Sequence, residues 1–417
     1  MWNLFLLSIA AVAAPARAAD VDLFSPDTLS LSGDGRLVLA DGEESWLDEG
    51  FGKLRASGSD GDWRAKPELG TVDLIWQPKI GFAWSATVVG TLQGGERTEA
   101  GLSEAFVSYK PMRGEKLRFS ARAGLMWPPV SLEHGGSDWH VLDTVTPSAI
   151  NSWIGEEVRP VAVEATLGTQ AAENDLSFTV ALMAANDTAG TLLTFRGWAL
   201  HDRKTLAFHR QPLPPLVELV EYVQPQFTTP LLDVPAGFAQ RPGYYARFVW
   251  TPPLPVRVEV VHYDNRADPE AVNADMEWGW RTRFDNLGIA ARLGENSGIK
   301  AQAMKGTTRM GFVENDRRWI DADFRSAFLL LTHDLGKSHL AARGEIFTIR
   351  NHGSYVTPEE DEKGWAVTLA ARKEISANIS VVGEVLHVDS KRKQRHEVSL
   401  AARQPQTQVQ LVLRGRW

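Results

Sequence analysis

The sequence predicts an all-β fold in which about sixteen antiparallel strands close into a transmembrane β-barrel. The first observation is the final segment, where Thr407, Val409, Leu411, Leu413, Gly415 and Trp417 alternate with Gln408, Gln410, Val412, Arg414 and Arg416. One face of such a strand suits lipid and the other suits water, and a terminal aromatic ring suits the membrane interface. The second observation is a regular alternation of short turns with long polar gaps. The third is a set of 15 Trp residues, many of them near strand ends.

The first eighteen residues are predicted to be a signal peptide. Met1 to Ala18 contains the apolar run Leu4 to Ala14, followed by an A-x-A cleavage pattern at Ala16 to Ala18. A buried N-terminal helix is the alternative. No later apolar stretch approaches the ~20 residues of a spanning helix, so a membrane location requires a closed barrel. With no cysteine and hence no disulfides, we expect residues 19–417 to form one barrel domain held by strand pairing.

The spacing of strand-like runs gives the strand count. Seven short, Pro- or Gly-rich gaps alternate with eight long gaps near 41–68, 93–100, 127–158, 187–242, 265–276, 306–318, 351–362 and 390–405. Sixteen strands follow, with both ends on the turn side, and eighteen would follow if Phe51 to Ser57 were also a membrane strand. Around Asn286 the alternation changes parity, which predicts either a bulge or a strand that extends past the membrane. A soluble sandwich or propeller is the alternative fold.

The termini and this spacing resemble bacterial outer-membrane porins of the sixteen-stranded type, both general and phosphate-selective. The resemblance implies location in the bacterial outer membrane, in contact with lipid and lipopolysaccharide. It also implies a homotrimer and a water-filled channel for passive diffusion of small hydrophilic solutes.

The third long gap, 127–158, is the candidate constriction loop. Trp127-Pro128-Pro129 ends a strand, and Thr146 followed by Pro147 is a helix start signal. In porins the third loop folds into the barrel and sets acids opposite wall bases. The resemblance therefore implies this role for Glu133, Asp138, Asp143, Glu156 and Glu157. The alternative is that Glu156 and Glu157 pair with Arg159 and the wall and so pin the loop.

The polar face of each strand predicts the charges on the channel wall. The inward bases would be Lys110, Lys116, Arg118, Arg122, Arg247, Arg257, Arg281, Arg283, Lys300, Arg325, Arg343, Arg372, Arg414 and Arg416. The inward acids are fewer: Asp73, Glu104, Glu164, Glu259, Asp321, Asp323, Glu345 and Glu384. An excess of bases favours anions, which predicts a weak anion preference. Alternatively, opposite charges on adjacent strands pair across the sheet and cancel.

The fourth long gap, 187–242, interleaves aromatic and basic residues. Its candidate binding residues are Arg196, Trp198, Arg203, Lys204 and Arg210. They could pack the loop or contact a neighbouring subunit, bind an anionic or sugar-like solute at the channel mouth, or contact lipopolysaccharide phosphates. A nucleic-acid partner does not fit this location.

Catalytic and metal-binding motifs are absent from the sequence. It contains no G-x-S-x-G, no H-E-x-x-H and no Gly-rich phosphate loop, which predicts no enzyme activity, no metal and no cofactor. Two rival functions stay open. A barrel hydrolase would need a Ser or Asp nucleophile beside a His base, and a non-conducting adhesin or structural barrel would have its lumen plugged by loops.

Overall fold

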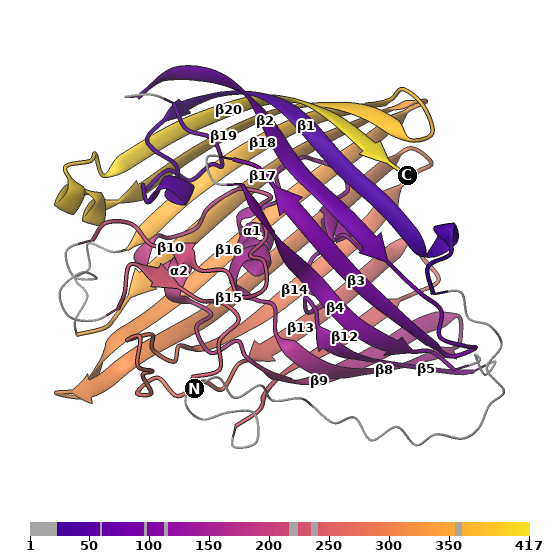
Figure 1. The fold of residues 1–417 in the computed structure, drawn as a ribbon, viewed down its shortest axis with the longest axis horizontal. Helices are drawn as coiled ribbons and strands as arrows, with labels where there is room; N and C mark the ends of the chain where they lie inside the picture. Colours follow the sequence, from indigo (N-terminus) through magenta and orange to yellow (C-terminus); the bar gives the residue numbers. More distant parts are fainter. Residues whose placement is uncertain are drawn as a thin grey trace.

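The computed structural model describes residues 23–58, 61–95, 98–111, 116–216, 224–234, 241–354 and 361–417. The predicted signal peptide, 1–18, lies outside the described residues. Sixteen strands form one closed barrel (Figure 1), in which each strand pairs antiparallel with its neighbours along the chain. The prediction of sixteen strands is confirmed, and Phe51 to Ser57 does not add a seventeenth or an eighteenth.

Short connections gather at one end of the barrel, called here the turn end, and long connections at the other, the loop end. In outer-membrane barrels these face the periplasm and the exterior respectively. The barrel strands are β1 (Leu29–Gly42), β2 (Gly61–Trp76), β3 (Trp84–Gln93), β4 (Glu99–Tyr109), β5 (Leu117–Leu125), β8 (Val161–Ala171), β9 (Asn174–Ala184), β12 (Gly243–Thr251), β13 (Val256–Asp264), β14 (Arg281–Leu293), β15 (Ser297–Glu314), β16 (Arg317–Leu335), β17 (Ser338–Asn351), β18 (Glu362–Glu374), β19 (Ile379–Arg392) and β20 (Arg403–Arg416).

The smaller elements lie in the connections. They are the helices α1 (Ala149–Glu157) and α2 (Thr191–Phe195), the 3-10 turns η1 (Pro26–Thr28), η2 (Trp46–Asp48) and η5 (Lys393–Val398), and the two-residue strands β6 (His134–Gly135), β7 (His140–Val141), β10 (Gln211–Pro212) and β11 (Phe227–Thr228).

The two ends of the described chain close the barrel. β1 pairs with β20 from Ser32 opposite Arg416 to Ala40 opposite Gln408. Beyond this ladder, the N–H of Trp417 donates to the carbonyl of Leu31 at 2.8 Å, and the N–H of Leu31 donates back at 2.8 Å. Closure leaves no free sheet edge, which is what a sheet in lipid requires.

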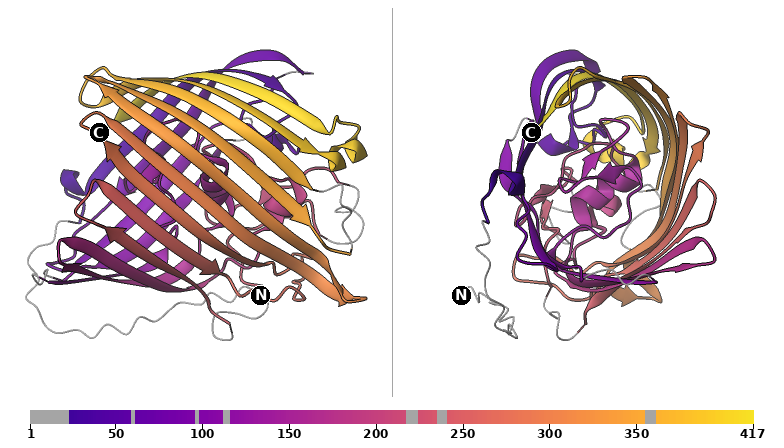
Figure 2. Two further views of the ribbon diagram at one scale, coloured as in Figure 1. Left: turned by 180° about the vertical axis from the view of Figure 1, so that it is seen from behind. Right: turned by 90° about the vertical axis from the view of Figure 1, so that its right-hand side faces the viewer.

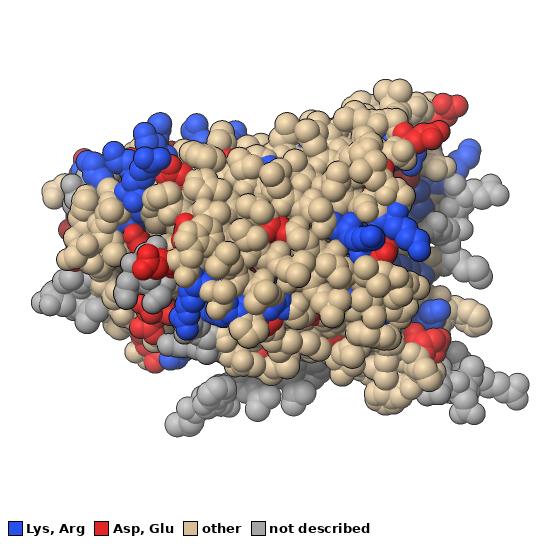
Figure 3. Space-filling view, turned by 90° about the horizontal axis from the view of Figure 1, so that it is seen from above, with Lys and Arg blue, Asp and Glu red and all other residues tan. Residues whose placement is uncertain are grey.

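The outer surface carries an apolar belt. On β20, Val409, Leu411 and Leu413 are exposed, whereas Gln408 and Gln410 face inward and are buried. Uncharged residues cover most of the middle of the face in Figure 3, with most charges toward its two ends. Among the described residues, no helix is long and apolar enough to cross a membrane.

Two neighbouring strands extend beyond this belt at the loop end. β15 has 18 residues and β16 has 19, so most of the polar stretch 306–318, expected to be a loop, is strand. Only Asn315 and Asp316 connect them, with φ of 49° and 63°, as a tight hairpin turn requires. Figure 2 (left) shows this orange hairpin projecting past its neighbours. The stretch looked like a loop because its outward side chains meet water.

The parity change near Asn286 has the same cause. β14 pairs with β13 and β15 without interruption through Asn286, so there is no bulge and the strand extends past the membrane. Its loop-end half turns Thr282 and Phe284 inward and Arg281 and Arg283 outward. The expectation that Arg281 and Arg283 line the channel is therefore wrong. Three more residues expected inside point outward for the same reason: Asp321, Asp323 and Arg325.

The interior of the loop-end half is filled by inserted loops. The third loop (126–160) and buried parts of the fourth loop, such as 188–207, enter the barrel, and Figure 2 (right) shows α1 within the ring of strands. Trp153 of α1 packs edge-on against the wall residues Phe284 and Phe324 and against Trp198 of the fourth loop. Because this interior is apolar, the polar faces of the surrounding strands turn outward, which explains the inverted assignments above.

Candidate functional site

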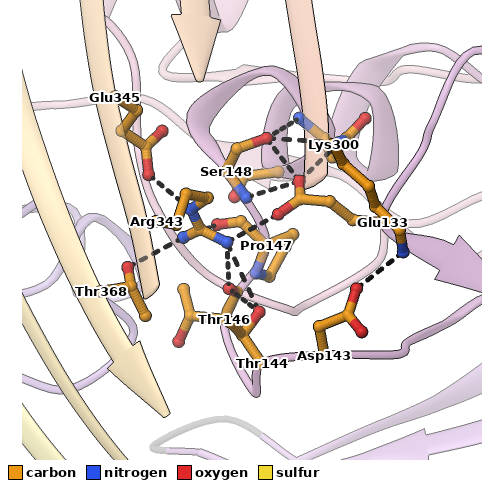
Figure 4. Close-up of polar contacts among 12 residues, drawn as sticks. Glu133, Asp143, Thr144, Thr146, Pro147, Ser148, Lys300, Arg343, Glu345 and Thr368 are labelled. Atoms are coloured by element: carbon orange, nitrogen blue, oxygen red, sulfur yellow. Dashed lines mark hydrogen bonds and ion pairs between the residues drawn. The ribbon is translucent and has the colours of Figure 1, made fainter. Parts of the chain in front are cut away.

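One wall arginine holds the third loop. Arg343, on β17, is 1% exposed and points into the barrel. Its guanidinium contacts the carboxylates of Glu133 at 2.7 Å and Glu345 at 3.0 Å, and donates to the carbonyl of Thr146 at 2.9 Å (Figure 4). The guanidinium group suits this buried position, because it has five N–H donors and stays protonated. Arg343 is therefore an anchor of the loop rather than a charge exposed to the channel.

Wall carboxylates complete the attachment of the loop to β17 and β19. Glu384 accepts the N–H of Val145 at 2.5 Å and that of Thr146 at 3.1 Å, and Glu345 accepts the N–H of Ala149 at 2.7 Å. Helix α1 begins at Ala149 with Ser148 as its N-cap, two residues later than the expected Thr146 cap. The cap lies at Ser148 because its hydroxyl accepts the N–H of Asn151, whereas the carbonyl of Thr146 accepts from Arg343 instead of from a helical N–H.

The acids at the end of α1 join the third loop to the fourth. Glu156 pairs with Arg196 at 2.6 Å and with His201 at 2.8 Å. Glu157 accepts the N–H groups of Gly190 at 3.0 Å and Leu192 at 2.9 Å. Burial disfavours ionisation of both, but Arg196 and His201 lower the pKa of Glu156 to about 2, whereas burial raises the pKa of Glu157 to about 7. Both acids attach loops, and neither pairs with Arg159 as the pinning alternative supposed.

The fourth-loop residues expected at the channel mouth lie inside the barrel, with one exception. Arg196, Trp198, Arg203 and Lys204 are all buried. Arg203 contacts Glu99 at 2.8 Å, and Lys204 donates to the carbonyl of Asp138 at 2.6 Å. Arg210 alone stays exposed, 3.4 Å from Asp275. Position along the chain suggested a mouth loop, but sequence spacing cannot show that a loop turns inward.

At the turn end, the wall bases form cross-strand pairs with acids. Arg122 binds Glu164 at 2.7 Å on the paired strand β8, and Arg118 binds Asp175. Arg247 and Arg257 share one carboxylate, Glu259, at 2.5 and 3.2 Å; the side chain of Arg257 is 46% exposed. The alternative in which wall charges pair and partly cancel therefore describes these residues, with one arginine in excess on β12 and β13.

A polar cavity of about 280 Å³ lies between the loops and the wall of β1, β2 and β18–β20. It reaches the turn end, since Ala377 and Asn378 of the β18–β19 turn are among its lining residues. Its charged lining comprises Asp34, Asp73, Asp138, Asp202, Lys204, Arg372, Glu374, Arg414 and Arg416, with His134 and His140. The cavity is a polar gap beside the loops, large enough for several waters, and its lining contains both signs of charge.

Two predicted loop acids lie near this cavity or the adjacent wall. Asp138 contacts His140 at 2.8 Å and accepts a hydrogen bond from Ser32 on β1 at 2.8 Å. Asp143 binds Lys300 at 2.7 Å and His339 at 3.1 Å (Figure 4). Against the cost of burial, these two bases hold the pKa of Asp143 at about 2. Both acids are therefore ionised at neutral pH and fix the loop to three different strands.

Sequence reasoning missed the charged residues that fix the first connection (43–60). Asp202 of the fourth loop binds Arg36 of β1 and, at 3.0 Å, Arg55. Lys53 pairs with Glu362 at the start of β18. These partners lie more than a hundred residues apart in sequence, so no local signal could have identified the pairs.

The described part of the chain contains two close Ser–His contacts, of which Ser297–His333, at 2.9 Å, is exposed on β15 and β16. Ser131 and His134 are 2.8 Å apart inside the barrel, but the Ser131 hydroxyl also accepts the N–H groups of Glu133 and His134, which makes it a turn contact. Among the described residues, no group of three His, Asp or Glu side chains could hold a metal ion.

Comparison with known proteins identifies the fold. No protein-family model matches the sequence, and no curated protein matches it. Solved structures do match: the outer membrane channel DcaP of Acinetobacter baumannii has a TM-score of 0.55 at 9% identity, covering 94% of this chain and 99% of that one. A loop L8 deletion mutant of OmpT, an outer membrane protein of Vibrio cholerae, has a TM-score of 0.52 at 10% identity, with coverage of 94% and 99%.

An anion-selective porin from Comamonas acidovorans also matches, with a TM-score of 0.50 at 10% identity and coverage of 94% and 99%. At such identities the likeness is one of fold. The chain has the closed sixteen-stranded barrel of bacterial outer-membrane porins, and its apolar outer belt is that of an outer-membrane protein.

Proposed function

We propose that the protein is a porin-like channel for passive diffusion of small hydrophilic solutes across the bacterial outer membrane, with a weak preference for anions. The observation that carries the proposal is the charged, partly solvated wall at the turn end. There Arg247 and Arg257 share the single carboxylate of Glu259, so one positive charge remains uncompensated. An excess charge in a lumen surrounded by lipid attracts counter-ions of the opposite sign.

The third and fourth loops would act as the constriction in this proposal. They are attached to the wall through Arg343, Glu345 and Glu384, and to each other through Glu156 and Arg196. A solute would have to pass between these loops and the wall, where the polar cavity beside β1 and β20 lies. We propose no enzymatic step, cofactor or metal for this passage.

The test is the reversal potential of single channels in a planar bilayer under a salt gradient. Removing the shared acid with Glu259→Gln should increase anion preference, because two arginines then lose their partner. Removing the exposed base with Arg257→Gln should shift the reversal potential toward cations. Lys373→Gln, on the outer surface of β18, is the matched control and should leave it unchanged. Equal reversal potentials in the two wall variants would contradict the anion preference but leave the channel intact.

A non-conducting barrel is the second candidate, and the filled loop-end lumen favours it. Trp153, Trp198, Phe284 and Phe324 form a buried apolar cluster across that half of the barrel. A folded barrel that never shows stepwise conductance would support this candidate over the channel.

A homotrimer and contact with lipopolysaccharide remain part of the proposal as expected partners. Cross-linking of the purified protein, or its mass in detergent, would test the trimer. Arg210 is the fourth-loop candidate that stays exposed to outer partners.

A further inference from the structure

The outer face of β13 to β16 carries a band of charged residues just above the apolar belt. One row of paired, outward-facing residues consists of His262, Asp285, Lys305 and Arg325. The next row toward the turn end is Val260, Leu287, Ala303 and Ala327. Polarity therefore changes between adjacent rows, which marks the level at which lipid headgroups meet the barrel.

Three bases in this band lack an acidic partner. Arg283, Lys305 and Arg325 are exposed, and among the ion pairs of the described residues none includes any of them. Arg283 donates only to the hydroxyl of Thr307, at 3.2 Å. Two acids lie beside these bases: Asp285, which is opposite Lys305 and contacts His262 at 2.8 Å, and Asp323, which contacts His352 at 3.5 Å.

Two of these bases are direct cross-strand neighbours. Lys305 on β15 is paired with Arg325 on β16, and both side chains point outward. Like charges placed directly opposite on a sheet destabilise it. By contrast, Arg281 and Arg309, another facing pair of bases, each have an acid: Asp264 at 3.3 Å and Asp321 at 3.0 Å. Lys305 also lies opposite Asp285 on β14, but that carboxylate contacts His262, so an anion from outside the chain would relieve the repulsion between Lys305 and Arg325.

A hollow of about 260 Å³ lies on this face, lined by the bases Arg283, Lys305 and Arg325, the acids Asp285 and Asp323, and the residues His262, Phe284, Gly306 and Thr307. We propose that it binds the phosphate group of an outer-leaflet glycolipid, with the acyl chains of the lipid lying along the apolar rows below. Three bases against two carboxylates leave the hollow with an excess of positive charge, which suits a phosphate, because phosphate oxygens accept charge-assisted hydrogen bonds from Arg and Lys.

This occupant fits better than a second copy of the chain. A copy that brought the same surface against itself would set bases against bases. A lipid supplies both the negative group at the level of the bases and the apolar tail at the level of Leu287, Ala303 and Ala327. The site lies outside the lumen, so the inference is independent of whether the channel conducts.

The test counts lipid molecules bound to the refolded protein by native mass spectrometry in detergent. The probes are diphosphorylated lipid A, the same lipid without its phosphates, and inorganic phosphate. We expect the wild-type protein to prefer the phosphorylated lipid, and Lys305→Gln or Arg325→Gln to weaken its binding by about tenfold each. Lys373→Gln, an exposed outward lysine near the turn end of β18, is the matched control and should bind as the wild type does.

Several results would overturn the proposal. Equal binding of both lipids, or unchanged binding in the Lys305 and Arg325 variants, would show that the bases recognise no phosphate on the lipid. Saturation by inorganic phosphate with no preference for lipid would assign the hollow to the free ion. A variant that changed the oligomeric mass but not the lipid count would assign the face to a second copy. Heat-modifiable mobility on a gel would establish that each variant is folded.

Discussion

A single buried side chain, Arg343, connects the wall to the third loop through the carboxylate of Glu133 and the carbonyls of Thr146 and Pro147. It also pairs with Glu345 on its own strand. Arg343 stabilises the fold mainly by neutralising its partners, because each of them would be an unpaired buried polar group without it. Replacing an entire buried ionic cluster by apolar groups is often neutral, whereas removing one partner is costly. Comparing a single substitution with a double substitution at this cluster therefore tests whether Arg343 neutralises Glu133.

Arg343→Met should lower the free energy of unfolding by about 3–5 kcal/mol, because Glu133 and Glu345 then remain buried without a counter-ion. Denaturant unfolding of the refolded barrel in micelles would measure it. The double variant Arg343→Met/Glu133→Gln should recover part of the loss. If Arg343→Met alone were as stable as the wild type, the anchor assignment would fail.

Glu157 predicts a dependence of stability on pH. Burial raises its pKa to about 7, whereas an unfolded Glu ionises near 4.5. Between these values the folded state holds a proton that the unfolded state has lost, so stability falls as pH rises from about 4.5 to 7, by up to ~1.4 kcal/mol per pH unit. Asp187, whose pKa burial also raises to about 7, acts in the same direction.

The measurement is the unfolding free energy of wild type and Glu157→Gln at pH 5, 6, 7 and 8. The variant should show a shallower fall between pH 5 and 7, and the slopes should converge above pH 7. Asp187→Asn is a comparison with the same expected direction. A wild-type stability that rises with pH over this window would refute the protonated, buried form of Glu157.

At the scale of elements, sequence patterns described the loop-end half of the barrel least well. Alternation and turn spacing were enough to predict sixteen strands and their turns, because lipid outside and water inside impose a strict period. They failed for Arg281 and Arg283 and for the stretch 306–318, where the outside is water and the inside is a packed loop. In that half, the polar face of a strand points outward and the apolar face inward. No local sequence signal shows whether a strand segment lies in lipid or beyond it.

Candidate site residues show the same limit. Arg118, Arg122, Arg247 and Arg257 lie on the inner face, since their strands are within the belt, where the parity rule applies. The sequence could not predict where the side chain of Arg196 lies, because its partner Glu156 belongs to another loop. Long-range pairs of this kind are decided by packing inside the closed barrel.

Replacing residues 191–207 with a Gly/Ser linker of equal length should raise single-channel conductance by about twofold or more, because the replaced segment fills the lumen beside α1. Replacement of 294–296, the exposed turn between β14 and β15, with Gly and Ser is the control and should leave conductance unchanged. A conductance equal to the wild-type value after the first replacement would mean that the fourth loop does not limit passage.

For the whole molecule, closure between β1 and β20 is the decisive contact, since an open edge in lipid leaves backbone groups unpaired. Leu31→Pro removes the N–H that donates to Trp417 and should cost about 3 kcal/mol or more, lowering the yield of folded, heat-modifiable barrel. Leu31→Ala keeps this N–H and shortens only the outward side chain, so its yield should stay near that of the wild type. Similar losses in both variants would attribute the effect to the side chain.

The extension of β14 to β16 past the apolar belt has an electrostatic consequence. In the turn-end half of the barrel the low-dielectric medium is the lipid outside the wall. In the loop-end half it is the apolar packing inside the wall, around Trp153 and Phe324. An ion moving along the axis would leave hydrated surroundings for an insulating plug, where solvation energy is lost. The polar cavity lies on the turn-end side of this plug, beside β1 and β20. We therefore expect the energy barrier for a charged solute to be set by hydration along the inserted loops rather than by the width of the barrel.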